Sequence, residues 1–283
     1  MRQFLRLLLA LPSLLVTGCS GADLVNALAS DDGYRRIIDQ RYGDAARQTL
    51  DLYVPMTPTR PKPVIVFFYG GNWDSGAKET YRFVGAAFAR RGFVVVVPDY
   101  RLYPAARYPR FIEDGAAATR WVFAHIGEFG GDPNRVSVMG HSAGAYIALM
   151  LALDPEWLGR DRKRLRCAVG LAGPYDFLPL GDPTLKRILA TASDLKKTQP
   201  ITYVDGSAPP VLLATGRLDH TVLPANTTRL AARIRAHGGA VKTIYYALLG
   251  HVTLIGALGE PLALITPVID DVTAFIAAHD GTN

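Results

Sequence analysis

Cysteine is nearly absent from this chain, and no internal repeat or low-complexity block is present. The 283 residues include two cysteines, Cys19 and Cys167. Because Cys19 belongs to a processing signal described below, Cys167 has no partner within the chain, which excludes a disulfide framework. Cys167 lies in the apolar run "CAVGLAG" and is expected to be a small buried hydrophobic side chain. With 49% hydrophobic and 20% charged residues, the composition is that of a globular protein with one large domain or two small ones.

A nucleic-acid-binding motif is also lacking. Lys and Arg number 31 against 25 Asp and Glu, a formal charge of +6. The densest basic run is "RDRKRLR", residues 160–166. Nucleic-acid binding needs a basic face together with a recognisable motif, so no nucleic-acid partner is predicted. The run indicates a solvated surface, with contact to anionic lipid or lipopolysaccharide as the alternative.

The N-terminal apolar run is too short to span a membrane as a mature helix. Arg2 and Arg6 precede the run 7–16, and small residues follow it, as in a secretory signal. The next residues, "LVTGCS", resemble the lipobox of bacterial lipoproteins, in which the cysteine is lipidated and becomes the first residue. The alternative is ordinary signal cleavage beside an incidental cysteine.

The lipobox resemblance implies three parts of the chain. Residues 1–18 are the signal peptide, residues 19–32 are the lipidated Cys19 and a tether, and residues 33–283 are the folded domain. Ser20 after the cysteine resembles the sorting pattern of Gram-negative lipoproteins, which implies a lipid anchor in the outer membrane facing the periplasm. Several acyl chains together anchor a protein stably, whereas a single one does not.

Apolar runs alternate with segments of helical periodicity along the rest of the chain. The patterns predict strands at 47–55, 63–68, 93–97, 135–139, 167–172, 210–214 and 241–248. Helices are predicted at 78–91, 111–126, 143–153, 183–197, 225–237 and 266–278. The first strand alternates like an edge strand, and the helix at 183–197 is expected outside the main layer. This alternation predicts an α/β fold with a mostly parallel central sheet and helices on both faces.

In such sheets, ligands bind outside the carboxyl ends of the strands. One predicted strand ends in "GHSAG", residues 140–144, and a helix follows at once. A serine on this sharp turn exposes its hydroxyl next to the free N–H groups of the helix N-terminus. The glycines are needed because a side chain at either position crowds the turn. Ser142 is therefore a candidate nucleophile, on the pattern known as the nucleophile elbow, and a plain tight turn is the alternative.

A serine nucleophile needs a base, and the base needs an acid to orient it. Asp219 and His251 follow two later predicted strands, in the chain order expected for this arrangement. His220 is the rival base, but a residue adjacent to Asp219 in sequence rarely faces both the acid and the serine. His141 precedes any candidate acid, and His237 lies at a helix end, where it is expected to act as a cap.

The strand at 63–68 is followed by "YGGNW", residues 69–73. Glycines here let backbone N–H groups converge on a developing negative charge. Gly70, Gly71 and Asn72, together with the N–H of Ala143, are therefore candidates for an oxyanion hole. A simple Gly-Gly turn is the alternative.

Taken together, these motifs resemble the α/β-hydrolase carboxylesterases, especially the bacterial branch related to hormone-sensitive lipase and kynurenine formamidase. The resemblance rests on "RQTLDLYVP", "FFYGGNWDSG", "VVVVPDYRLYP", "GGDPNRVSVMGHSAG" and "AGPYDF", in this order, and on the surroundings of Asp219 and His251. One departure is that Tyr69 stands where such families have His, and Asn72 where they have a third Gly or another residue. The phenol of Tyr69 is a candidate to hold the loop as the family His does.

The resemblance implies a serine esterase with Ser142, His251 and Asp219 as its triad and no metal or organic cofactor. Residues 173–207 are a short insertion and not a large lid, which favours soluble or short-acyl esters over long-chain fats. A formamidase or an esterase of cell-wall acyl groups (feruloyl or acetyl) would use the same machinery. A membrane-anchored binding protein that has lost turnover is the alternative from a different class, and the sequence leaves the oligomeric state open.

Overall fold

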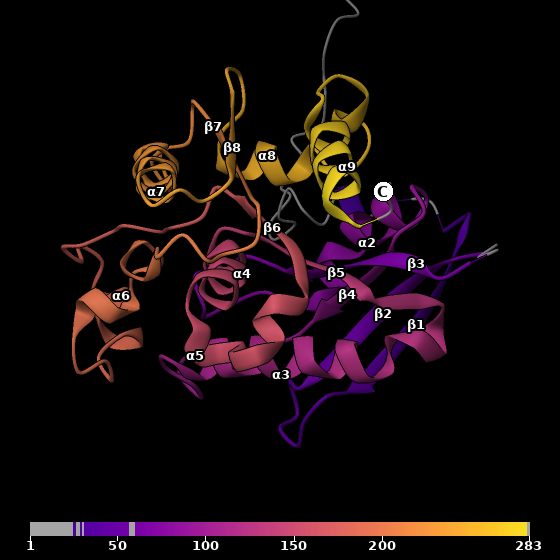
Figure 1. Ribbon diagram of the computed structural model, residues 1–283, viewed down its shortest axis with the longest axis horizontal. Helices are drawn as coiled ribbons and strands as arrows, with labels where there is room; N and C mark the ends of the chain where they lie inside the picture. Colours follow the sequence, from indigo (N-terminus) through magenta and orange to yellow (C-terminus); the bar gives the residue numbers. More distant parts are fainter. Residues whose placement is uncertain (1–24, 27–28, 30, 57–59, 282–283) are drawn as a thin grey trace, which may run out of the picture.

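One eight-stranded sheet organises the molecule. The computed structural model describes residues 25–26, 29, 31–56 and 60–281 (Figure 1). The strands are β1 (Tyr34–Arg41), β2 (Thr49–Pro55), β3 (Lys62–Phe68), β4 (Val94–Pro98), β5 (Gly131–His141), β6 (Leu165–Leu171), β7 (Val211–Gly216) and β8 (Val241–Tyr246). They lie in the order β1-β2-β4-β3-β5-β6-β7-β8. β1 pairs antiparallel with β2 and β2 with β4, whereas every later pair is parallel.

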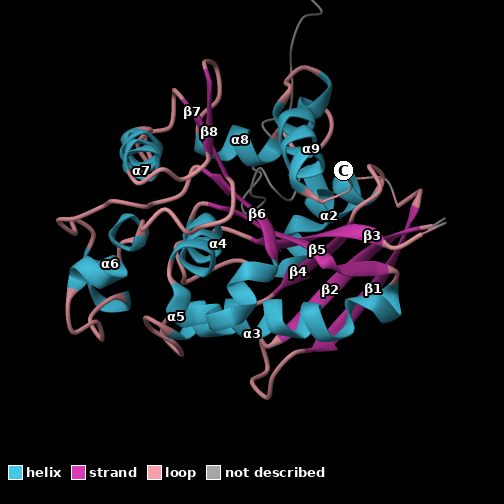
Figure 2. Ribbon diagram, viewed as in Figure 1, coloured by secondary structure: helices cyan, strands magenta, loops and turns pink. Residues whose placement is uncertain are grey.

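Helices connect the parallel strands, and two more helices follow the last strand. They are α2 (Arg82–Ala89), α3 (Arg110–His125), α4 (Ala143–Leu153), α5 (Pro155–Leu158), α6 (Pro183–Ile188), α7 (Ala225–Ala236), α8 (His251–Gly256) and α9 (Val268–His279). Short 3-10 turns lie at η1 (Lys78–Tyr81), η2 (Ile126–Phe129), η3 (Gly159–Arg164), η4 (Leu195–Thr198), η5 (Pro200–Tyr203) and η6 (Leu262–Leu264). Figure 2 shows α2 and α9 on one side of the sheet and α3 and α4 on the other. The predicted mostly parallel sheet with helices on both faces is thus confirmed.

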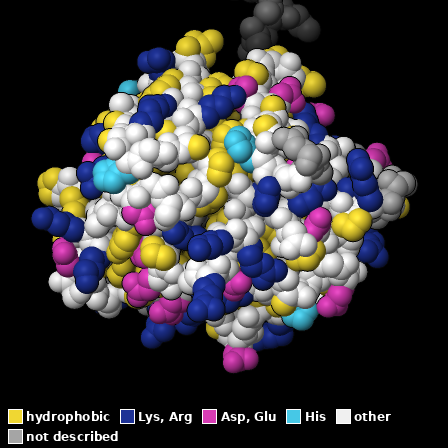
Figure 3. Space-filling model, in the orientation of Figure 1, with side chains coloured by type: hydrophobic (Ala, Val, Ile, Leu, Met, Phe, Trp, Pro, Cys, Tyr) yellow, Lys and Arg dark blue, Asp and Glu magenta, His cyan; other side chains and the backbone are white. Residues whose placement is uncertain are grey.

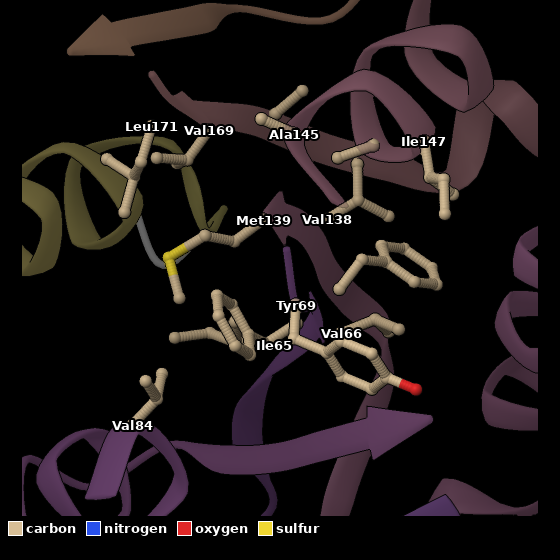
Figure 4. Packing of buried hydrophobic residues seen from close by; sticks show 14 of the residues in the cluster. Ile65, Val66, Tyr69, Val84, Val138, Met139, Ala145, Ile147, Val169 and Leu171 are labelled. Atoms are coloured by element: carbon tan, nitrogen blue, oxygen red, sulfur yellow. The ribbon is translucent and has the colours of Figure 1, made fainter. Parts of the chain in front are cut away.

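The core lies between the central strands and the helices on either side. The middle strands read as continuous apolar runs because both faces of the sheet are covered. Figure 4 shows Val138 of β5 on the side of Ile147 of α4 and Ile65 of β3 on the side of Val84 of α2, and all four are fully buried. Each such side chain contributes about 1.5–3 kcal/mol when it leaves water. This rigid centre fixes the strand ends that follow it in the chain.

Four elements differ from the sequence-based prediction, namely β1, β2, α6 and α8. β2 is not an edge strand, because the unpredicted β1 pairs with it along residues 34–41. β1 was missed since only Tyr34 on it is buried and the rest of its side chains are polar or at least partly exposed. α8 was also missed, and the predicted helix at 183–197 is shorter, with α6 ending at Ile188 before the 3-10 turn η4.

The basic run 160–166 is not a uniformly solvated surface. Arg162 is buried and donates hydrogen bonds to the carbonyl oxygens of Ala152 and Leu153 at the end of α4. Arg164 lies over the ring of Phe123, 4.1 Å from its centroid. These arginines satisfy helix-terminal carbonyls and cover apolar surface, so their role is structural. Lys and Arg side chains are scattered over the face shown in Figure 3.

The residues near the N-terminus partly pack onto the body. Val25 is buried, and a Cβ added to Gly259 would meet its side chain. Asn26 donates to the carbonyl of Glu79 and accepts from the N–H of Phe83. The packed body therefore begins before the predicted boundary at residue 33. The predicted signal peptide and Cys19 lie outside the described residues, and none of the described helices combines the length and apolar character needed to cross a membrane.

Candidate active site

The turn between β5 and α4 holds Ser142 in a strained conformation. Its φ of 54° and ψ of −122° are rare for a residue with a side chain. A Cβ on Gly144 would lie 2.0 Å from the carbonyl oxygen of Phe68, and one on Gly140 would lie 2.2 Å from the backbone of Gly144. Both glycines are thus required by close packing of backbone on backbone, as the sequence predicts. The strain is of the kind that clusters at functional sites.

The structure brings Ser142, His251 and Asp219 together from the ends of β5, β8 and β7. His251 Nε2 lies 2.9 Å from Ser142 Oγ, and its Nδ1 lies 2.8 Å from Asp219 Oδ2. His220, the rival base, is exposed and makes no hydrogen bond to either group in the described chain. The geometry therefore places His251 between the hydroxyl and the carboxylate.

Asp219 is only 1% exposed. Its Oδ1 accepts hydrogen bonds from the N–H groups of Thr221 and Val222, at 2.9 and 2.8 Å. Burial by itself raises the pKa of Asp219, but the bonds from His251 and these two N–H groups outweigh it. The pKa of Asp219 is consequently below its usual value, and its charge is held facing His251.

The loop after β3 lies against the elbow. Gly70 packs so closely that an added Cβ would lie 3.0 Å from Ser142 Cβ. Gly71 has a φ of +122°, and Asn72 and Trp73 have φ values of 51° and 59°. Such left-handed backbone is costly for a tryptophan, which here is buried and stacked on Phe111.

The N–H groups of Gly71 and Asn72 donate no backbone hydrogen bond in the described chain. The N–H of Ala143 is equally unpaired, because it opens α4. All three residues line the same pocket as Ser142. The side-chain amide of Asn72 donates a long hydrogen bond of 3.4 Å to Asp74 Oδ2.

The side chain of Tyr69 is a fully buried anchor beneath this loop. Its hydroxyl donates to Asp99 Oδ1 at 2.5 Å and accepts from Arg47 Nη2 at 2.7 Å. Asp99 also accepts from the N–H of Lys78, and Arg47 donates to the carbonyl of Gly76. Lys78 and Gly76 lie at the far end of the loop that begins at Tyr69. Through Asp99 and Arg47, the Tyr69 hydroxyl therefore links the start of the loop to its end.

His141 is a residue that sequence reasoning passed over. It is 4% exposed, and its ring lies 4.7 Å from the ring of His251. Its Nε2 lies 3.1 Å from the carbonyl oxygen of His251, so Nε2 carries the proton and donates it. Burial, together with the nearby His251, lowers the pKa of His141 to about 3. His141 is thus a neutral side chain that supports the backbone of His251. Its position directly before Ser142 in the sequence was the signal that could have identified it.

These residues open into a cleft of about 1190 Å³. Its walls come from the loop after β3, the segment between β6 and α6, the turn after β7 and the start of α8. The wall residues include Tyr81, Phe177, Leu178, Leu185, Leu223, Arg229, Val252 and Ile255. Arg229 is paired with Asp176 at 2.5 Å. The lining is mostly apolar, and no large lid covers the cleft in the described chain.

Comparison with known proteins gives the fold and the family. Residues 50–234 match the BD-FAE family. A carbohydrate esterase from gut microbiota superposes with a TM-score of 0.79 at 21% identity, over 89% of this chain and 98% of that one. Esterase B from Lactobacillus rhamnosis, solved with a tributyrin phosphonate, gives 0.78 at 20% identity over 91% and 90%. These likenesses show an α/β-hydrolase fold, as the sequence predicts.

Sequence relatives are named as esterases. Isoprenylcysteine alpha-carbonyl methylesterase ICME of Arabidopsis thaliana is 30% identical over 84% of this chain and 61% of its own length. Esterase LipC of Mycobacterium tuberculosis is 32% identical over 72% of this chain and 57% of its own length. The chain spans 55–63% of the length of the first three curated relatives that it matches.

Proposed function

The chain belongs to the BD-FAE family, and from that premise we propose that it is a serine carboxylesterase acting on small or short-acyl esters. The observation that carries the proposal is the continuous chain of hydrogen bonds from Asp219 through His251 to Ser142. That chain faces an apolar cleft lined also by Gly71, Asn72 and Ala143, whose N–H groups donate no backbone hydrogen bond within the described residues. The esterase relatives support the same reaction class.

The mechanism follows from this geometry. Ser142 Oγ attacks the ester carbonyl while His251 Nε2 takes the hydroxyl proton. The carbonyl oxygen becomes an oxyanion and accepts hydrogen bonds from the N–H groups of Gly71, Asn72 and Ala143. Gly70 shapes the same hole, because its lack of a side chain lets the loop approach Ser142.

The tetrahedral intermediate then collapses. The C–O bond to the alcohol breaks, and His251 gives its proton to the departing oxygen, leaving an acyl group on Ser142. A water molecule then attacks the acyl carbon while His251 Nε2 takes its proton. The bond from that carbon to Ser142 Oγ breaks, His251 returns the proton to Oγ, and the acid is released. Asp219 keeps Nδ1 of His251 protonated and stabilises the imidazolium that forms in each half of the reaction.

Turnover of p-nitrophenyl acetate by the purified protein tests the proposal. We expect hydrolysis by the wild type and a loss of several orders of magnitude in Ser142→Ala. Ala fits the turn, so the variant should unfold at the same denaturant concentration as the wild type. A variant that keeps a tenth or more of the activity would remove Ser142 from the mechanism, and an inactive wild type would favour a binding protein.

We also propose that Cys19 carries the lipid that anchors the protein to the bacterial envelope, in the outer membrane facing the periplasm. The support is the lipobox pattern in the sequence. Cys19→Ala should move the protein from the membrane fraction to the soluble fraction, because the acyl chains then have no attachment point. Wild-type protein that is soluble after signal cleavage would overturn the anchor and leave the esterase proposal unaffected.

A further inference from the structure

Exposed apolar side chains gather around α8. The described chain has nine large hydrophobic side chains that are strongly exposed, and four of them lie between residues 248 and 265. These are Leu248, Val252, Leu264 and Ile265, with exposures of 86%, 58%, 74% and 78%. Leu218, exposed by 52%, lies beside them, because its N–H bonds to the carbonyl of Leu249. We call these five side chains the α8 face.

The segment 248–265 has almost no charge. Glu260 is its one charged residue, although a fifth of the whole chain is charged. Figure 3 shows apolar side chains at separate places along the upper edge of the molecule, among charged side chains, on the side where the connection from α8 to α9 lies in Figure 1. Scattered exposed hydrophobic residues are ordinary, but a grouped set in an uncharged segment marks an interaction surface.

The position of Val25 indicates which partner lies against this surface. Val25 packs against the same segment, since Cβ atoms added to Gly256 and Gly259 would lie 3.9 and 2.6 Å from its side chain. Cys19 precedes Val25 by six residues, which span at most roughly 20 Å when fully extended. A body of this size has a radius of gyration of about 18 Å, so such a short connection cannot reach around it.

We propose that the α8 face lies against the bilayer that holds the lipid anchor. The proposal rests on the anchor proposed at Cys19, and it also concerns the esterase. α8 begins with His251, and Val252 lines the mouth of the cleft. A membrane at the α8 face therefore borders the entrance to the cleft. We infer that esters whose alcohol part sits in the membrane interface are presented to Ser142 directly.

Site-specific fluorescence on the full chain tests the orientation. Ile265→Cys and, as the matched control, Leu195→Cys are produced with the native signal and reconstituted into vesicles of phosphatidylethanolamine and phosphatidylglycerol. Leu195 is also an exposed large apolar residue, at 41%, but it lies in η4 beyond α6. Because Cys167 is buried and Cys19 acylated, an environment-sensitive thiol dye labels the introduced cysteine.

We expect the dye at 265 to shift to shorter wavelength and to be quenched by lipid-borne quenchers, and the dye at 195 to do neither. Equal behaviour at both positions on co-floating protein would overturn the orientation. Protein that does not float with the vesicles would overturn the anchor, and the orientation with it. Turnover of p-nitrophenyl acetate reports separately on the esterase.

A second variant tests the consequence for the substrate. Leu264→Ser combined with Ile265→Ser removes two side chains of the α8 face that do not line the cleft. The double variant should hydrolyse a vesicle-borne butyrate ester of an alkylated fluorescein several-fold more slowly than the wild type. Its turnover of p-nitrophenyl acetate should be unchanged. Equal rates on the vesicle-borne ester would overturn delivery from the membrane.

Discussion

Replacing Tyr69 by Phe removes one oxygen from the network beneath the oxyanion loop. The ring stays, stacked between Tyr81 and Tyr100 at centroid distances of 5.3 and 4.8 Å. Two hydrogen bonds disappear, the one donated to Asp99 and the one accepted from Arg47. Arg47 retains the carbonyls of Gly76 and Tyr100 as acceptors, so the main loss falls on Asp99.

Asp99 is 8% exposed. Burial raises its pKa, and the hydrogen bond from Tyr69 and the charge of Arg47 act in the opposite direction. A hydrogen bond to a charged group contributes about 1.5–3 kcal/mol. Tyr69→Phe should therefore lower the free energy of unfolding by about 1.5–3 kcal/mol, equivalent to roughly 3–12 °C in melting temperature for a domain of this size.

The rate should fall as well, because the loop that presents the N–H groups of Gly71 and Asn72 is then held by fewer contacts. We expect kcat for p-nitrophenyl acetate to drop by about tenfold or more, on the scale of a lost positioning contact. Urea unfolding and steady-state kinetics measure the two effects on the same preparation.

Tyr53→Phe is the matched control. The hydroxyl of Tyr53 is also buried, but it has no hydrogen-bond partner in the described chain, and Tyr53 packs against α2 away from the cleft. Its loss should leave stability and rate close to those of the wild type. If Tyr69→Phe behaved like Tyr53→Phe in both measurements, the phenol would not hold the loop and the reasoning would be refuted.

Three further predictions concern single residues of the site. His251→Ala should be nearly inactive and His220→Ala much less impaired, and kinetics showing the reverse order would assign the base to His220. Asn72→Gly should keep most of the activity, because its amide points to Asp74 and a φ of 51° suits glycine; a loss of roughly 10²–10³ would mean that the amide itself binds the oxyanion. His141 has a folded pKa of about 3, below its unfolded value, so the stability it contributes is complete above about pH 6.5 and is lost as pH falls toward 3. Between pH 7 and 5 the wild type should thus lose about 2 kcal/mol more than His141→Gln, which keeps a donor to His251 and does not titrate; parallel urea-unfolding profiles would contradict this.

The sequence could place the chemistry because the rules of parallel sheets are strong. Apolar runs mark strands buried on both faces, and the carboxyl ends of such strands meet at one edge. Ser142, Asp219 and His251 each follow such a run, and the structure brings them within hydrogen-bond distance. Their catalytic roles remain predictions that the variants test.

Local patterns could not find the parts that depend on tertiary contacts. β1 has few buried side chains and becomes a strand by pairing with β2. α8 has six residues, too few for helical periodicity to appear. Arg47, Tyr69 and Asp99 are far apart in sequence, so only the folded chain shows that they form one network. His141 was judged as a base by chain order, whereas its contact is with the backbone of His251.

The backbone packing at Gly144 has a consequence for directed evolution. Because a Cβ at position 144 would stand 2.0 Å from the carbonyl oxygen of Phe68, this position tolerates no side chain, and β3, β5 and α4 must be kept together as one unit. The cleft wall from Asp176 to Leu185 is under no such constraint, since even a Cβ added to its Gly181 would meet nothing within 4 Å. Libraries that randomise this wall should therefore yield many folded variants with altered selectivity, and libraries at the elbow should yield few that fold at all.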